Sequence, residues 1–304
     1  AYFKCHFTRE YMAALLTSVL DNSDKVSGYI GECRECGIAL LPPDINRSAD
    51  RFTVEEGGIR FGLVAIKNIG RGFIQAVMRE RETGGDFSSL YDFCSRMNGS
   101  EMNKRAVENL IRSGAFDSMG ARRSQLIKVY ETVMDSVAAQ QRDNVEGQMD
   151  FFSMAAASSG APAPVKEIPL PDIPEYTPEE LMTMEKATTG LYLSGHPMDH
   201  YREIVRKLNA PSISSILADF AREDGPERFA DGQRVTIAGV ITSSKTKTTK
   251  NNSLMAYVMV EDDTASMELL CFSRVLETCG AYMKENLAVV VKGRLSVRDE
   301  KAPQ

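Results

Sequence analysis

No run of apolar residues in this sequence approaches the roughly 20 that a helix needs to cross a bilayer, although 43% of its 304 residues are hydrophobic. The sequence also lacks an initial methionine, and Ala1-Tyr2-Phe3-Lys4 lacks the basic and then apolar layout of a signal peptide. We therefore expect no membrane segment and a cytoplasmic location. An amphipathic pattern begins at once, as in a piece of a longer protein.

Cysteine and histidine are scarce, with six and three residues. The cysteines are spread over the whole chain, unlike the dense framework of a small secreted domain, so we expect reduced thiols. Cys33 and Cys36 form one CxxC, and no second pair follows that would complete the four ligands of a structural zinc. We favour a place on a helix face for this pair over a metal or redox site.

Net positive charge is missing too, since the formal charge is −6. This excludes a uniformly basic nucleic-acid coat. The segment from Arg60 to Lys128 nevertheless contains 12 Lys or Arg against 7 Asp or Glu. One contiguous basic stretch in an acidic protein is typical of a phosphate-binding module.

Apolar periodicity and punctuating residues predict a mainly helical first half. A hairpin of 52–54 and 59–61 is expected around Gly57-Gly58. Residues 153–175, rich in Ala, Ser, Gly and Pro, predict a flexible linker. Thr177 is the expected N-cap of the helix that follows it. The predicted helices cover residues 9–20, 25–36, 62–68, 73–82, 88–96, 103–113, 121–142 and 177–189.

The last 70 or so residues change to a strand pattern. Strands are predicted at 234–241, 254–260, 265–272 and 287–297, with a helix at 273–283 and a bulge or bend at Gly239. This order is the start of an OB-fold, a five-stranded barrel that binds oligonucleotides. Because the chain stops at Gln304, we expect the last strand to be missing. The predicted fold class is α+β and multidomain.

Val64 to Ile74 predicts a helix, a turn with two glycines, and a second helix. Glycines let the backbone approach another chain closely, and the free amides at a helix start form a phosphate site. This is the layout of a helix-hairpin-helix that grips a DNA backbone. The candidate DNA contacts are Lys67, Asn68, Gly70, Arg71 and Gly72. A plain packing corner between two helices is the alternative.

A second unit of the same kind follows, and two tandem units could contact both strands of a duplex. Its helix opens at Asn103, and Ser113 to Asp117 forms its turn. A solvated helix face is the alternative for this unit. The candidate DNA contacts are Lys104, Arg105, Gly114, Arg122 and Arg123.

The predicted barrel contributes a lysine-containing loop after its first strand and aromatic residues in its strands. We expect Lys245, Lys247 and Lys250 to touch phosphate and Tyr257 to stack on bases of a single strand. A solvated loop is the alternative for the lysines. For Phe272 a place in the core is favoured.

Two adjacent aromatic residues border the predicted linker, and exposed apolar anchors there are typical of a partner site. The stretch Gln148, Met149, Asp150, Phe151 and Phe152 resembles the clamp-binding consensus of bacterial replication proteins. A hydrophobic staple at a helix end is the alternative.

Strings along essentially the whole chain resemble the bacterial DNA polymerase III alpha subunit, a family of replicative polymerases. The most specific is Gly190-Leu191-Tyr192-Leu193-Ser194-Gly195-His196-Pro197. His196 has no nearby catalytic constellation in the sequence, so we assign it a structural place. The other strings are residues 10–16, 41–46, 59–63, 67–70, 103–105, 113–117 and 185–186.

The resemblance implies a parent enzyme, a DNA-directed DNA polymerase that uses Mg²⁺ held by acidic residues of an upstream palm. That palm is not in this chain, so we expect no catalytic residue, metal or cofactor here. The implied partners are duplex and single-stranded DNA, the sliding clamp and other replisome subunits. The implied domains are the end of the fingers (1–50), a tandem helix-hairpin-helix domain (51–145), the clamp motif and linker (146–175), a helical connector (176–232) and an OB-fold (233–304).

Two other functions stay open. One is a translesion paralogue of the same family. The other is a DNA repair or ligase fragment, since such proteins also combine OB-folds with helix-hairpin-helix units. A bacterial ligase usually places its OB-fold first and adds a four-cysteine zinc site, whereas this chain has the reverse order and one CxxC.

Overall fold

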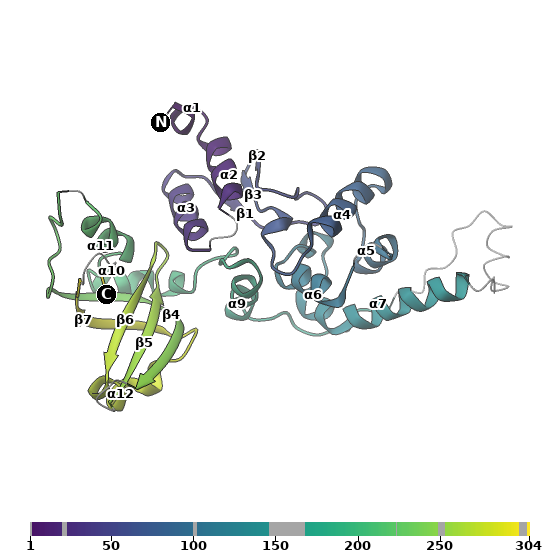
Figure 1. The fold of residues 1–304 in the computed structure, drawn as a ribbon. Helices are drawn as coiled ribbons and strands as arrows, with labels where there is room; N and C mark the ends of the chain where they lie inside the picture. Colours follow the sequence, from purple (N-terminus) through teal and green to yellow (C-terminus); the bar gives the residue numbers. More distant parts are fainter. Residues whose placement is uncertain are drawn as a thin grey trace. The chain divides into compact units, whose positions relative to one another are not determined.

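The computed structural model describes residues 2–19, 23–99, 102–145, 168–222, 224–248, 253–297 and 303–304. The chain forms two compact units: unit 1 is Ala1–Ser23 with Cys36–Ser194, and unit 2 is Asp24–Glu35 with Gly195–Gln304. Figure 1 shows unit 1 mostly as helices in purple to teal, and unit 2 around a sheet in green to yellow. The predicted α+β class is confirmed.

Unit 1 contains a small three-stranded sheet in the order β1-β3-β2. The predicted hairpin is confirmed as β2 (Thr53–Glu55) and β3 (Gly58–Arg60), which pair antiparallel. The strand β1 (Leu40–Leu41) adds to β3 in parallel. Gly58 is required at its place, because it has a φ of +154° and an added Cβ would lie 2.1 Å from the carbonyl oxygen of Ala39.

Helices make up most of the rest of unit 1, and Thr177 is confirmed as the predicted N-cap. Asn103 accepts a hydrogen bond from the amide of Ala106, and Thr177 forms a capping box with Glu180. Figure 1 shows α9 beside α6. The helices are α1 (Tyr2–His6), α2 (Thr8–Ser18), α4 (Arg71–Gly84), α5 (Leu90–Met97), α6 (Lys104–Arg112), α7 (Arg123–Val145) and α9 (Pro178–Thr189), with the 3₁₀ turns η1 (Leu63–Ala65) and η2 (Asp117–Met119).

The helix predicted over residues 62–68 is wrong. Only η1 is helical, because Ile66 already has an extended backbone and Asn68 has a φ of +63°. In so short a segment, tertiary packing determines the backbone conformation. Ile66 and Ile69 are buried on either side of the turn, so the turn is anchored in the core at two points.

Aromatic rings form the centre of unit 1. Phe93 is fully buried and meets Phe73, Phe87 and Phe116 edge to face, with ring centroids 5.0 to 6.2 Å apart. Edge-to-face pairs add to the free energy gained by burial alone. Burial in the same core raises the pKa of the Cys94 thiol to about 12. This cluster joins α4, α5 and the turn after α6 into one body.

Unit 2 is built around four antiparallel strands in the order β6-β5-β4-β7. The strands are β4 (Arg234–Thr248), β5 (Leu254–Glu261), β6 (Ser266–Phe272) and β7 (Ala288–Arg294). The unit also holds α3 (Ser23–Glu35) from residue 24 on, and its other helices are η3 (Pro197–Tyr201), α10 (Arg202–Lys207), α11 (Ile213–Phe220), α12 (Ser273–Cys279) and η4 (Gly280–Tyr282).

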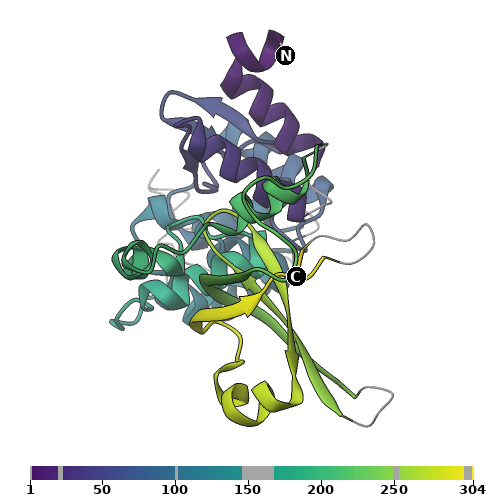
Figure 2. The ribbon, with the colours of Figure 1, turned by 90° about the vertical axis from the view of Figure 1, so that its left-hand side faces the viewer.

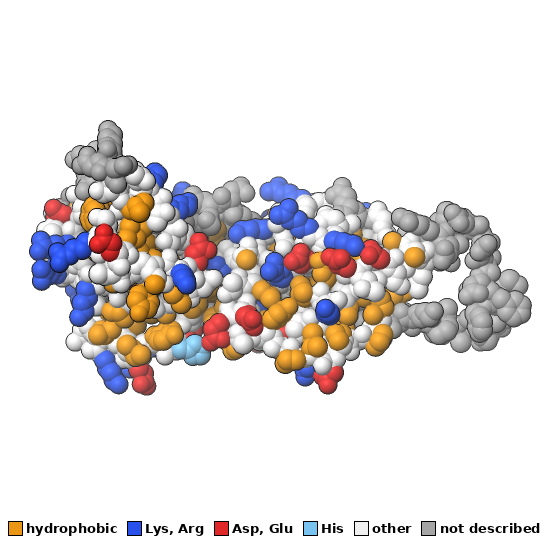
Figure 3. All heavy atoms as spheres, turned by 90° about the horizontal axis from the view of Figure 1, so that it is seen from below, with side chains coloured by type: hydrophobic (Ala, Val, Ile, Leu, Met, Phe, Trp, Pro, Cys, Tyr) orange, Lys and Arg blue, Asp and Glu red, His pale blue; other side chains and the backbone are white. Residues whose placement is uncertain are grey.

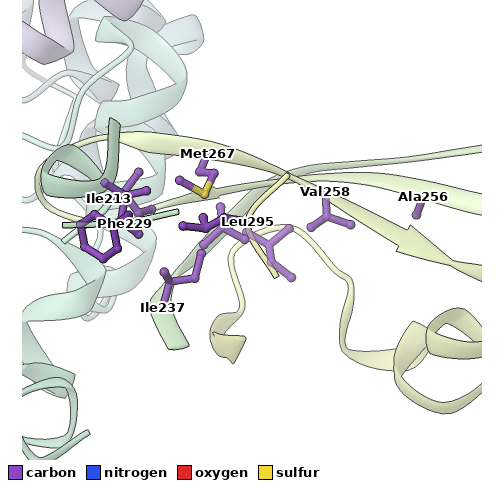
Figure 4. Close-up of a cluster of buried hydrophobic side chains, with 10 residues drawn as sticks. Ile213, Phe229, Ile237, Ala256, Val258, Met267 and Leu295 are labelled. Atoms are coloured by element: carbon purple, nitrogen blue, oxygen red, sulfur yellow. The ribbon is translucent and has the colours of Figure 1, made fainter. Parts of the chain in front are cut away.

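The core of unit 2 lies on the concave face of this sheet. Ile237, Val258 and Met267 come from three different strands, and Ile213 of α11 with Phe229 packs among them (Figure 4). Two carboxylates tie loops to this core. Asp219 accepts bonds from the amides of residues 227–229, and Asp262 accepts one from the amide that starts α11.

The strand β4 differs from its prediction in two ways. It extends to Thr248, so Lys245 and Lys247 lie in a strand and not in a loop; the long paired strands are visible in green in Figure 2. The register shift falls between Ile241 and Ser243, so a bulge is present but not at Gly239, where a bulge or bend was predicted. Gly239 instead lets β4 lie close to the side chain of Val260 on β5, because an added Cβ would lie 2.5 Å from it.

Candidate nucleic-acid interfaces

The first hairpin, residues 66–72 between η1 and α4, presents an open helix start. Gly70 is the N-cap of α4, no side chain caps the helix, and its first turn contains no acidic residue. Arg71 and Gly72 are exposed. The starts of α5, α6, α9 and α11 are each capped by their own Ser, Asn or Thr. Free amides at an exposed, uncapped start, next to an arginine, suit a phosphate group.

The turn itself is held rigidly from two sides. The side-chain amide of Asn109 donates to the carbonyl of Lys67 at 2.6 Å. The amide of Lys67 donates to the carbonyl of Thr188 on α9 at 2.8 Å, and its ammonium reaches the carbonyl of Ala187 at 3.1 Å. Lys67 therefore helps to fix the turn to α6 and α9. Sequence analysis missed Asn109, whose only signal is a polar residue on a buried helix face.

The second hairpin, residues 113–123 between α6 and α7, has a different helix start. The carboxylate of Glu175 accepts hydrogen bonds from the amides of Arg123 at 2.7 Å and Ser124 at 3.0 Å. Partial burial raises the pKa of Glu175, but the backbone hydrogen bonds outweigh it, so this pKa lies below its ordinary value. A carboxylate of the protein thus occupies the place where a phosphate would bind.

Arg123 lies in the interior of unit 1. Its guanidinium pairs with Asp117 at 2.7 Å and Glu185 at 3.0 Å, and the side chains of Arg123 and Glu185 are only 7% and 1% exposed. Glu185 also accepts from the amides of Leu193 and Ser194. Gly114 leaves room for this arginine, because a Cβ there would lie 2.2 Å from its nitrogen. This burial argues against the prediction that Arg123 contacts phosphate.

The other basic residues of the second hairpin differ in how they are engaged. Lys104 pairs with Asp135 at 3.0 Å and Glu131 at 3.6 Å on α7, and the hydrogen bond to Asp135 raises its pKa. Arg122 donates to the carbonyl of Ile173 and lies 3.5 Å from Asp172. Arg105 is exposed.

The outer face of the unit 2 sheet brings lysines and aromatic rings together. Lys245 lies directly opposite Tyr257, and the ammonium of Lys247 lies 5.5 Å from the centre of the Tyr257 ring. Phe272 follows on β6 with 58% of its surface exposed. The expected core place of Phe272 is therefore wrong. In an OB-fold the face of the second and third strands carries the ligand, and β5 and β6 take that order here.

Two comparisons with known proteins found similar sequences. Residues 37–126 match a helix-hairpin-helix motif family, and residues 235–304 match an OB-fold nucleic acid binding domain family. DNA polymerase III subunit alpha of Saccharopolyspora erythraea is 36% identical over 98% of the chain and 24% of the relative. The Vibrio cholerae subunit is 32% identical over 98% and 25%, and the Deinococcus radiodurans subunit 36% over 98% and 22%.

The chain is similar over nearly its whole length to the DNA polymerase III alpha subunits. It spans about a quarter of the length of these relatives. The helix-hairpin-helix match covers both hairpins of unit 1, and the OB-fold match begins at Val235 in β4. The resemblance stated from the sequence strings is confirmed, and so is the order of a hairpin region followed by an OB-fold.

Several predicted residues lie outside this description. The candidate clamp-binding residues Gln148, Met149, Asp150, Phe151 and Phe152, as well as Lys250, are outside the described residues.

Metal and membrane features were searched in the described part of the chain alone. No group of three or more His, Cys, Asp or Glu side chains there could hold a metal ion, and no helix there is long and apolar enough to cross a membrane. Cys33 is buried and Cys36 is exposed. His196 is buried, and its Nδ1 accepts from the amide of Met198 at the start of η3.

Proposed function

We propose that this chain holds DNA for a replicative DNA polymerase of the DNA polymerase III alpha family. The first hairpin grips the backbone of duplex DNA, and the outer face of β4, β5 and β6 receives a single-stranded template. The observation that carries this proposal is the open start of α4, with exposed Arg71 and Gly72 and no capping side chain. Its amides are the kind that bind phosphate without reading the bases.

The distribution of charge supports DNA contact at a few separate basic patches. Basic side chains in Figure 3 lie in separate patches among acidic and apolar ones, as expected for a chain of net charge −6. DNA bound in this way is held by a few phosphate contacts. Such binding should be strongly salt dependent, because each neutralised phosphate releases counterions.

On the sheet face, stacking and phosphate contact would act together. Tyr257 and Phe272 offer flat surfaces to bases, and Lys245 and Lys247 lie beside them for the backbone. Stacking of a base on an aromatic ring tolerates any sequence. This suits a polymerase, which must accept every template.

The catalytic role belongs to the proposed parent enzyme, which would add deoxynucleotides to a primer end with Mg²⁺. We assign this chain no catalytic residue and no cofactor of its own. Its further partners would be other replisome subunits. Residues 148–152 would bind the sliding clamp, and binding of the chain to the clamp of its own organism should be lost in the double variant Gln148→Ala, Phe152→Ala; a clamp bound equally well by this variant would rule the assignment out.

The duplex contact is tested by the salt dependence of binding. For Arg71→Gln, the slope of log affinity against log salt should become shallower by about 0.9, the value of one phosphate contact on duplex DNA. Fluorescence anisotropy with a labelled duplex of random sequence gives this slope.

The matched control is Arg79→Gln, an exposed arginine further along the same helix. It should leave the slope unchanged. Equal slopes for wild type and Arg71→Gln, or an equal loss in both variants, would contradict a contact at the start of α4.

A further inference from the structure

Unit 2 has a second basic surface, separate from the one that Lys245 and Lys247 form on the sheet face. A groove of 820 Å³ runs beside α10 and the first half of β4, and Arg206, Arg228 and Arg234 line it. All three are exposed. Within the described residues none of them forms an ion pair, whereas Arg202, which also lines the groove, pairs with Asp199 at 2.7 Å.

The carboxylates of the groove are largely engaged elsewhere. Asp199 holds Arg202 and the amide of His196. Asp262 accepts bonds from the amides of Ile213, Thr264 and Ala265. Only Asp263 adds an exposed acid to the lining. The three arginines therefore keep a net positive field in the groove.

The sheet beside the groove adds a pair of like charges. Arg234 on β4 lies directly opposite Arg294 on β7, and Thr236 lies directly opposite Lys292. Residues that face each other across strands project to the same side, and like charges there destabilise a sheet. Ile237, which alternates with them, belongs to the core, so these basic residues point away from it. A bound anion would relieve their repulsion.

We propose that this arginine groove, lined by Arg206, Arg228 and Arg234, binds the phosphate backbone of single-stranded nucleic acid together with Lys292 and Arg294 on the neighbouring strand. It rests on the single-strand binding proposed for unit 2 and adds a second contact to it. The forked N–H groups of arginine match phosphate oxygens in pairs. Arg228 is partly oriented for this, since its guanidinium lies 5.5 Å from the centre of the Phe229 ring.

A nucleic acid fits this surface better than an acidic protein segment. The basic side chains are exposed, whereas the centre of a protein interface is depleted of charge and desolvated. The two single-strand contacts are also well separated. Arg234 and Lys245 lie on one strand, at a distance of up to roughly 36 Å along it. One long oligonucleotide could therefore occupy both.

The test compares salt slopes for a labelled oligothymidylate of about 30 nucleotides, longer than the site of a single OB-fold. The variants are Arg234→Gln with Arg294→Gln, and Lys245→Gln with Lys247→Gln, in the whole chain. Each double variant should make the slope shallower by about 1.4, since a single-strand phosphate contact contributes about 0.7. Arg274→Gln, an exposed arginine on α12, is the control and should change nothing.

The outcomes separate the two proposals. A slope unchanged by the arginine variant but reduced by the lysine variant overturns the arginine groove and leaves the sheet face supported. No binding by the wild-type chain overturns both. A labelled polyglutamate is the competing ligand. If it binds more tightly than the oligonucleotide, and if this binding is lost in the arginine variant, the groove binds an acidic protein segment. That result would overturn the groove as a nucleic-acid site. The melting temperature of the arginine variant should be equal or higher, because the like-charge pair is gone.

Discussion

The two hairpins of unit 1 each lead through a glycine-containing turn into a helix, but the two helix starts are filled differently. At α4 the cap is Gly70, and no side chain among the described residues accepts from the first amides. At α7 the carboxylate of Glu175 accepts from two amides, and Arg123 beside them is buried with Asp117 and Glu185. One start is available to a phosphate, and the other is satisfied within the protein.

This difference shows that a basic residue near a helix start is not by itself a nucleic-acid contact. The second hairpin has two adjacent arginines, Arg122 and Arg123, yet both are paired with carboxylates of the protein itself. The first has Arg71 exposed next to free amides. Internal pairing makes the second hairpin a structural counterpart of the first.

The largest effect is expected at the buried pair of the second hairpin. Glu185→Ala leaves Arg123 buried with only Asp117, and breaking a buried ion pair on one side costs about 3–5 kcal/mol. Denaturant unfolding of the chain, followed by a signal from the helices of unit 1, measures this loss of free energy. Thr183→Ala, an exposed change on the same helix, should cost far less. A loss no greater than that of the control would show that the ion pair between Arg123 and Glu185 does not stabilise the second hairpin.

A smaller effect is expected at the carboxylate that fills the start of α7. Glu175→Gln removes a charged cap, which should lower the free energy of unfolding by about 1 kcal/mol. It should also raise affinity for duplex DNA, because a phosphate then meets no competing carboxylate at α7. Unfolding and anisotropy measured on the same variant check both effects. Lower or unchanged duplex affinity would show that the second hairpin stays closed to DNA for another reason.

The same carboxylate gives a pH dependence of definite sign. The folded pKa of Glu175 lies below its ordinary value of 4.5. Its stabilisation is therefore fully present above that value and is lost as the pH falls through the folded pKa. The difference in stability between wild type and Glu175→Gln should shrink as the pH is lowered below 4.5. A difference that stays constant into that range would contradict the cap.

Features decided by local sequence were predicted well. The N-cap Thr177, the helix that starts at Asn103 and the hairpin around Gly57-Gly58 follow from residues that are neighbours in the chain. The order of the barrel strands along the chain does so too. The family resemblance also rests on such strings. These are the features for which short-range propensities and turn chemistry carry the information.

Features decided by distant residues were missed. Glu175 caps a helix that begins 52 residues before it in sequence, and Asn109 holds a turn 42 residues away. The outward direction of Phe272 depends on the register of three strands. No short window of the sequence contains these pairings, so nothing in the sequence indicated that Arg123, a candidate DNA contact, is buried.

The most direct test of the open and filled helix starts is amide hydrogen exchange with and without duplex DNA. Without DNA, the amides of residues 71–73 should exchange fast, and those of Arg123 and Ser124 should already be protected by Glu175. Added duplex should protect residues 71–73 and leave Arg123 and Ser124 unchanged. New protection at Arg123 and Ser124, with none at residues 71–73, would contradict the account.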